Sequence, residues 1–107
     1  MTKFEERAKA FENHFHHKVD VNLAIKAKAY KMLGFWAAGL LGITNQDEVV
    51  NYAMELVIFE YDHSHQGTAI DKLVQDFAQN NINVSRFDIE DKLEESKQQA
   101  YAEIMGE

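Results

Sequence analysis

The sequence predicts an all-α protein: a small antiparallel four-helix bundle over residues 19–107, preceded by an N-terminal amphipathic helix or arm over residues 1–18. The first reason is composition, because the 107 residues include no proline and only five glycines, so few positions interrupt a helix. The second is a repeated capping pattern, a hydroxyl residue followed three positions later by an acid, which satisfies free N–H groups at a helix start. The matches are Thr2/Glu5, Thr44/Asp47, Thr68/Asp71 and Ser85/Asp88.

Helices that begin at these caps cover most of the chain. The expected ranges are about 3–18, 20–41, 45–61, 69–79 and 86–105. The first two helices are either continuous or divided at Asp20, which could cap a new helix or interrupt one. Gly42 suits the left-handed position after a helix end. Residues 62–67 form a polar linker, and the pair Asn80-Asn81 closes the fourth helix.

Each helix after residue 18 has an apolar stripe at helical spacing, and together the stripes are expected to close one core. The expected inward residues are Leu23, Tyr30, Leu33, Ala37 and Leu40; Val49, Ala53, Leu56 and Val57; Ile70, Leu73, Val74, Phe77 and Ala78; Ile89, Leu93, Ala100 and Ile104. Short connections favour antiparallel neighbours, which predicts a four-helix bundle. Gly34 and Gly39 weaken the helix that contains them, so we expect them to allow close approach of another helix. Phe35 and Trp36 are interpreted as core or helix–helix contacts.

The N-terminal arm carries an apolar stripe of its own. Phe4, Ala8, Phe11, Phe15 and Val19 lie within roughly 80° of one another at about 100° per residue. Basic side chains border one edge of the stripe and acidic ones the other: Lys3, Arg7, His14 and Lys18 against Glu5 and Glu12. Since the other four stripes suffice for a core, we interpret this one as a surface that inserts into a partner. The alternative is a small interaction module whose first helix packs in its own core or in a homodimer.

Charge and residue usage exclude several classes of function. Residues 1–18 hold four Lys and Arg against three Glu, a net charge of +1, while residues 19–107 hold seven against fifteen acids, a net charge of −8. Such an acidic body would repel a phosphate backbone, so we expect no nucleic-acid partner. The longest apolar run, residues 32–41, is too short to span a bilayer, and no secretory signal is evident at the start of the chain. We therefore expect an intracellular protein without direct membrane insertion.

The sequence offers little basis for catalysis, a metal or a cofactor. There is no cysteine, which excludes disulfides and thiolate sites. A single Glu-x-x-His match, Glu60 to His63, lacks the second copy and the further carboxylates that a bundle metal site requires. We find no nucleophile with a placed base and no glycine-rich phosphate loop. The prediction is a protein that is not an enzyme and that binds no metal or cofactor.

Three segments resemble the small zeta-type inhibitor subunit of the F-type ATP synthase of alphaproteobacteria: FEERAKAF (4–11), KMLGFWAAGLLG (31–42) and NVSRFDIEDKLEES (83–96). The resemblance covers nearly the whole chain. It implies a regulatory subunit in the cytoplasm, held on the inner membrane through the synthase. Its N-terminal helix would insert among the alpha, beta and gamma subunits of the catalytic head and block ATP-hydrolysing rotation. Carried onto this chain, the partner-binding residues are Thr2, Lys3, Phe4, Glu5, Arg7, Ala8, Phe11, Glu12 and Phe15.

Overall fold

The computed structural model describes residues 17–62 and 67–106, with side chains from Val21 onward. These residues form four helices and no strand: α2 (His17–Leu40), α3 (Gln46–Tyr61), α4 (Ala69–Gln79) and α5 (Arg86–Met105). The expected all-α bundle is therefore confirmed, and each of the four helices begins and ends within about three residues of its predicted limits. The first expected helix, residues 3–18, and its Thr2/Glu5 cap lie almost wholly outside the described residues.

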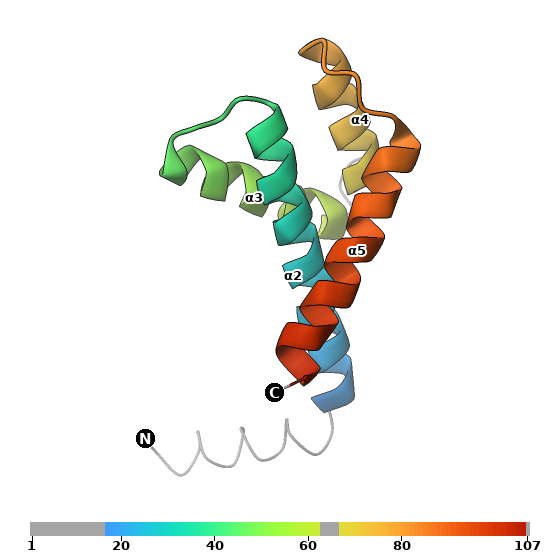
Figure 1. Cartoon of the computed structure of the whole chain (residues 1–107). Helices are drawn as coiled ribbons and strands as arrows, with labels where there is room; N and C mark the ends of the chain where they lie inside the picture. Colours follow the sequence, from blue (N-terminus) through green and yellow to red (C-terminus); the bar gives the residue numbers. More distant parts are fainter. Residues whose placement is uncertain (1–16, 63–66, 107) are drawn as a thin grey trace.

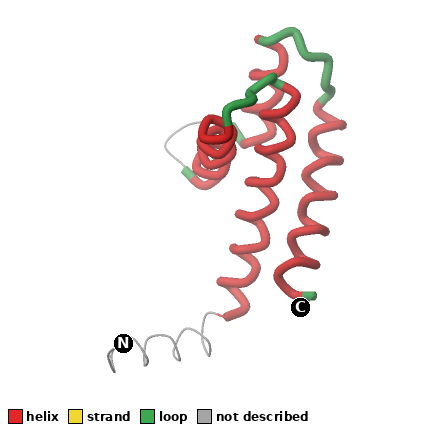
Figure 2. The backbone as a smooth tube through the Cα atoms, turned by 60° about the vertical axis from the view of Figure 1, so that its left-hand side comes forward, coloured by secondary structure: helices red, strands yellow, loops and turns green. Residues whose placement is uncertain are grey.

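The two longest helices, α2 and α5, lie side by side and antiparallel, and α4 and α5 form a second antiparallel pair (Figure 1). Helix α3 lies across α2, so it is seen nearly end-on in the view in which α2 and α5 run vertically (Figure 2). The start of α2 and the end of α5 share one end of the molecule. Helix α2 begins three residues before Asp20 and therefore passes through the expected division of the chain after residue 18.

Two of the predicted helix caps are confirmed, and one is wrong. Thr68 and Ser85 each accept a hydrogen bond from the backbone N–H three residues on, and the acid at that position bonds back to the cap, which completes a capping box. Helix α3 is capped differently. Asn45, rather than Thr44, accepts from the N–H of Glu48 at 3.1 Å. Two adjacent polar residues could serve as this cap, and the amide oxygen of Asn45 takes the position.

The ends of α2 and α4 share one geometry. After α2, Gly42 has φ +82°, and the N–H of Ile43 donates to the carbonyl of Ala38 at 3.0 Å. After α4, Asn81 has φ 58°, and the N–H of Ile82 donates to the carbonyl of Phe77 at 2.8 Å. Both are six-residue closures around a left-handed residue, which satisfy carbonyls that the helix leaves free. The predicted stops at Gly42 and at the Asn pair are therefore confirmed.

All four helices contribute to one core. Its largest fully buried side chains are Leu33 of α2, Leu56 of α3, Leu73 and Phe77 of α4, and Ile89 of α5. The Phe77 ring also meets Trp36 edge-on at 5.9 Å, which confirms that Trp36 makes a helix–helix contact.

The inward face of α2 differs from the predicted stripe. Leu23 is 50% exposed and Leu40 is 42% exposed, whereas Ile25 and Ala29 are buried. Both wrongly assigned leucines lie towards the ends of α2, and its neighbours α3 and α5 cover a face centred between them. Ala78 of α4 was also expected inside and is exposed. Periodicity locates an apolar face, but the crossing of α3 decides which part of it is covered.

The two glycines inside α2 behave differently. A Cβ atom at Gly34 would lie 2.6 Å from the Cα of Ala53, so the absence of a side chain lets α2 and α3 cross at close range. This confirms the expectation for Gly34. At Gly39 no atom lies within 4 Å of such a Cβ, so the same expectation for Gly39 is wrong.

Candidate partner-binding surfaces

The predicted partner-binding residues all lie in the N-terminal arm, between Thr2 and Phe15, outside the described residues. Their assignment therefore stays a prediction. Within the described residues, the structure adds a second surface that was not predicted from the sequence, an apolar groove on the outer side of α2.

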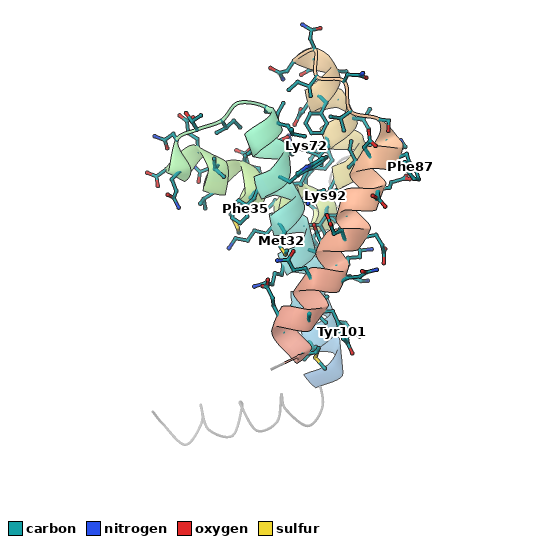
Figure 3. The ribbon with its side chains drawn as sticks, viewed as in Figure 1. Met32, Phe35, Lys72, Phe87, Lys92 and Tyr101 are labelled. Carbon is teal, nitrogen blue, oxygen red and sulfur yellow. The ribbon has the colours of Figure 1, made fainter. Side chains whose placement is uncertain are left out.

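This groove has a volume of about 610 Å³ and lies where α3 and α5 flank α2. Helix α2 supplies most of its lining, including Ala24, Ala27 and Phe35, while α3 contributes Met54 and Val57. Met32 also lines it, and Figure 3 shows Met32 and Phe35 together on α2, well away from Phe87 on α5. Phe35 was expected to be a core or helix contact, and it is partly exposed at this groove instead.

Charged side chains mark two positions along the groove. Lys28 forms an ion pair with Glu103 of α5 at 2.9 Å, on the α5 side. The pKa of the Glu103 carboxyl is lowered, first by the hydrogen bond from Lys28 and then by the one from Gln99. Lys31 places its amine 5.9 Å from the centre of the Phe35 ring. The groove therefore has an apolar α3 side and a polar α5 side, with two cationic residues on α2.

Sequence patterns contain a weak signal for this surface. Ala24, Ala27, Lys31 and Phe35 recur at helical spacing on the face of α2 opposite its buried residues. The two lysines interrupt the apolar pattern, and the α3 and α5 contributions come from distant parts of the chain. Only the packed structure brings them together.

A polar cluster fixes α3 to α4. The Tyr52 hydroxyl donates to Oδ2 of Asp76 at 2.6 Å, and the amine of Lys72 pairs with the same oxygen at 2.9 Å. Lys72 also lies 5.1 Å from the centre of the Tyr52 ring. Burial of the phenol and its bond to Asp76 raise the pKa of Tyr52 well above its ordinary value. Each polar group has a partner inside the cluster, so the cluster holds two helices together.

A second polar contact joins α2, α3 and α4. The carboxylate of Glu60, near the end of α3, accepts a hydrogen bond from the N–H of Ala69 at 2.9 Å and so satisfies the start of α4. Burial, followed by the nearby charge of Glu60, raises the pKa of Tyr30 to about 12. Tyr30 in turn meets the Tyr61 ring edge-on at 6.2 Å. Glu60 therefore has a structural role here, whereas His63 of the Glu-x-x-His match lies outside the described residues.

Comparison with protein families shows to which family the chain belongs. The family model for the ATPase inhibitor subunit zeta matches residues 1–103, nearly the whole chain. The chain belongs to the ATPase inhibitor subunit zeta family. Comparison with curated proteins and with solved structures finds no match.

Membership of the zeta family confirms the resemblance of the three sequence segments. The family description is that of an inhibitor, so it supports a regulatory subunit rather than a catalyst and implies an interaction with the ATP synthase. The match includes the N-terminal arm as well as the bundle.

The remaining features of this zeta-family chain concern metal ligands, membrane spans and the charge of α5. Among residues 17–62 and 67–106, no group of three or more His, Asp or Glu side chains is placed to hold a metal ion. No helix of the described residues is long and apolar enough to cross a membrane. Five acidic residues are exposed on α5: Asp88, Glu90, Asp91, Glu94 and Glu95.

Proposed function

We propose that this zeta-family protein inhibits the F-type ATP synthase by inserting its N-terminal arm into the catalytic head. The arm, residues 1–18, contacts the alpha and beta subunits and the gamma subunit of the central stalk, while residues 19–107 stay outside as a bundle. In this proposal the protein is cytoplasmic and is held at the inner membrane only through the synthase. It has no catalytic role of its own.

The observation that supports this division is the composition of the core. Helices α2, α3, α4 and α5 each supply fully buried side chains to one cluster, among them Leu33, Leu56, Phe77 and Ile89. A bundle with its own core has no need of a fifth apolar stripe. The three phenylalanines of the arm are therefore available to another molecule, and buried aromatic anchors supply much of the free energy at protein interfaces.

Inhibition of this kind requires no contact with a reacting atom. An ATPase that works by rotation depends on opening and closing of its catalytic subunits, and such conformational steps commonly limit turnover. A helix held between these subunits blocks the closing motion. A segment of this length is only marginally helical by itself, so ordering it on binding lowers the affinity and keeps inhibition reversible.

The direct test is an ATP hydrolysis assay with the purified catalytic head from the protein's own source. Replacing Phe11 with Ala is expected to raise the concentration for half-inhibition at least roughly tenfold, which corresponds to about 1.4 kcal/mol. Lys9→Ala is the matched control, because Lys9 lies on the side of the arm away from the stripe. Unchanged inhibition by Phe11→Ala removes Phe11 from the contacts. Unchanged inhibition by Phe4→Ala, Phe11→Ala and Phe15→Ala alike would reject the arm as the inhibitory element.

Amide exchange on the isolated protein provides a second test. Exchange over residues 2–17 that is much faster than exchange in α2 and α5 fits an arm that is available to a partner. Protection there as strong as that of α2 and α5 would instead favour the alternative, in which the first helix belongs to the protein's own core or to a homodimer.

A further inference from the structure

We propose that the groove between α2, α3 and α5 is a resting site for the protein's own N-terminal arm. The arm cannot occupy the groove and the ATP synthase at the same time, so docking in the groove reduces inhibition. This inference rests on the proposed function, because it concerns the regulation of the same arm. Three properties of the groove argue for this occupant: its length, its position relative to the start of α2, and its charges.

The first property is length. On α2 the groove extends from Ala24 to Phe35. The apolar stripe of the arm extends from Phe4 to Phe15, the same number of residues. At a rise of about 1.5 Å per residue, both distances are about 16 Å. A helical arm therefore has the length to place its phenylalanines along the apolar lining, including Met54 of α3.

The second property is the connection between arm and groove. The arm joins the bundle at the start of α2, which shares one end of the molecule with the end of α5 that carries Glu103. If the chain reverses over residues 17–20, the arm runs antiparallel to α2. Phe11 then lies beside residue 26 and Phe4 beside residue 33, at about 1.5 Å per residue on both helices. The reversal opens the first turn of α2, and Asp20 is then placed to cap the shortened helix.

The third property is charge. On α2, Gly34 faces α3 and Lys28 faces α5, which fixes the two sides of the groove. For an antiparallel arm whose phenylalanines face α2, right-handed helix geometry turns the basic edge with Lys3 and Arg7 towards α3. It turns the acidic edge with Glu5 and Glu12 towards the side of Lys28. Helix α3 contains four acids and no basic residue: Asp47, Glu48, Glu55 and Glu60. The acidic edge of the arm therefore faces a basic residue of the groove, and its basic edge faces the helix whose charged residues are all acidic.

A weak contact suffices for this role. Because arm and groove belong to one chain, their effective concentration is in the millimolar range for a short connection. Only protein whose arm is undocked can bind the synthase, so the apparent affinity is the intrinsic affinity multiplied by the undocked fraction. The synthase can then displace the arm without any covalent or ligand signal.

Paired cysteines test the docking directly, since the native chain contains no cysteine. In the full chain carrying Ala8→Cys and Ala27→Cys, mild oxidation is expected to form an intramolecular disulfide. Ala27 lines the groove, and Ala8 lies on the stripe of the arm. The control pair combines Ala8→Cys with Ala78→Cys, because Ala78 is exposed on α4 and does not line the groove. Closure of the first pair at least about tenfold faster than the control supports docking, and equal rates overturn it. A disulfide-linked dimer as the main product overturns it in favour of a second copy.

A groove substitution separates this inference from the proposed function. Met54→Arg places a charge in the apolar lining at a side chain that is already 41% exposed, so the bundle is expected to fold. It should slow closure of the Ala8→Cys/Ala27→Cys pair and lower the concentration for half-inhibition by at least about threefold. Phe87→Arg, at a 72% exposed position outside the groove, should do neither.

The outcomes of these assays are distinct. Unchanged closure and unchanged inhibition by Met54→Arg overturn the resting site while the inhibitory arm stands. Equal closure rates of the two cysteine pairs, together with loss of inhibition by Phe11→Ala, also overturn the resting site while the inhibitory arm stands. If the native protein fails to inhibit at all, the proposed function fails, whatever the disulfide rates show. Ala27→Arg serves as the second groove variant if circular dichroism shows that Met54→Arg has lost its helices.

Discussion

Replacing Gly34 with Ala should destabilise the bundle, although alanine is the better helix former. The added Cβ would lie 2.6 Å from the Cα of Ala53. Carbon atoms in ordinary contact are about 3.5–4.0 Å apart, so α3 would have to move away from α2 by about 1 Å. Overpacking costs about 1–3 kcal/mol, and here the obstacle is backbone, which places the cost near 3. Subtracting the helix propensity of alanine, about 1 kcal/mol, leaves a net loss of about 2 kcal/mol.

The same substitution at Gly39 provides a matched control in the same helix. No atom lies within 4 Å of a Cβ at Gly39, so Gly39→Ala should gain about 0.5–1 kcal/mol from helix propensity alone. Urea unfolding followed by circular dichroism measures both variants. With a urea dependence of about 1–3 kcal/mol/M, their midpoints should differ by roughly 1 M or more. If Gly34→Ala is as stable as the native protein, the close crossing of α2 and α3 does not depend on glycine, and the reasoning is wrong.

Two further predictions concern a helix cap and a buried phenol. Thr68→Ala should lower the free energy of unfolding by about 1 kcal/mol, because the Thr68 hydroxyl accepts a hydrogen bond from the N–H of Asp71. Thr44→Ala should change the free energy of unfolding by less than about 0.5 kcal/mol, because Asn45 caps α3. Urea unfolding measures both variants, and equal losses would contradict the cap assignment. The free energy of unfolding should also fall as the pH rises above about 10, because the folded-state pKa of Tyr30 is raised to about 12 and the unfolded protein loses that proton first. Tyr30→Phe should make this decline shallower in urea titrations between pH 8 and 11, and an identical slope would show that Tyr30 ionises as readily in the folded protein.

Local chemistry made the helix limits predictable. Thr68 and Ser85 each combine a hydroxyl with an acid three residues later, and no neighbouring residue competes for the cap. Gly42 and Asn81 are residues that tolerate positive φ, and both occupy that position after a helix end. The prediction of Thr44 as a helix cap was wrong because the next residue, Asn45, is an equally good cap. Sequence spacing does not rank two adjacent candidates.

The inward face of α2 and the groove could not be predicted, because both depend on how the helices pack together. The apolar period of α2 is compatible with either Leu23 or Ile25 facing inward, and the crossing of α3 at Gly34 leaves Leu23 outside. The groove has the same origin, since its lining combines residues from three helices, such as Ala27, Met54 and Gln99. The stripe of the arm, by contrast, is formed by residues close together in the sequence and could be recognised from sequence alone.

The hydrogen bond between the Glu60 carboxylate and the N–H of Ala69 spans the polar linker that joins α3 to α4. Because this bond fixes the two ends of the linker, the spacing of the helices depends little on what lies between them, and the entropy cost of a longer loop rises slowly with length. A peptide epitope or a fluorophore-binding tag inserted between Asp62 and Gly67 would therefore leave the bundle, the groove and the arm intact. Such a reporter would allow binding of the subunit to the ATP synthase to be measured.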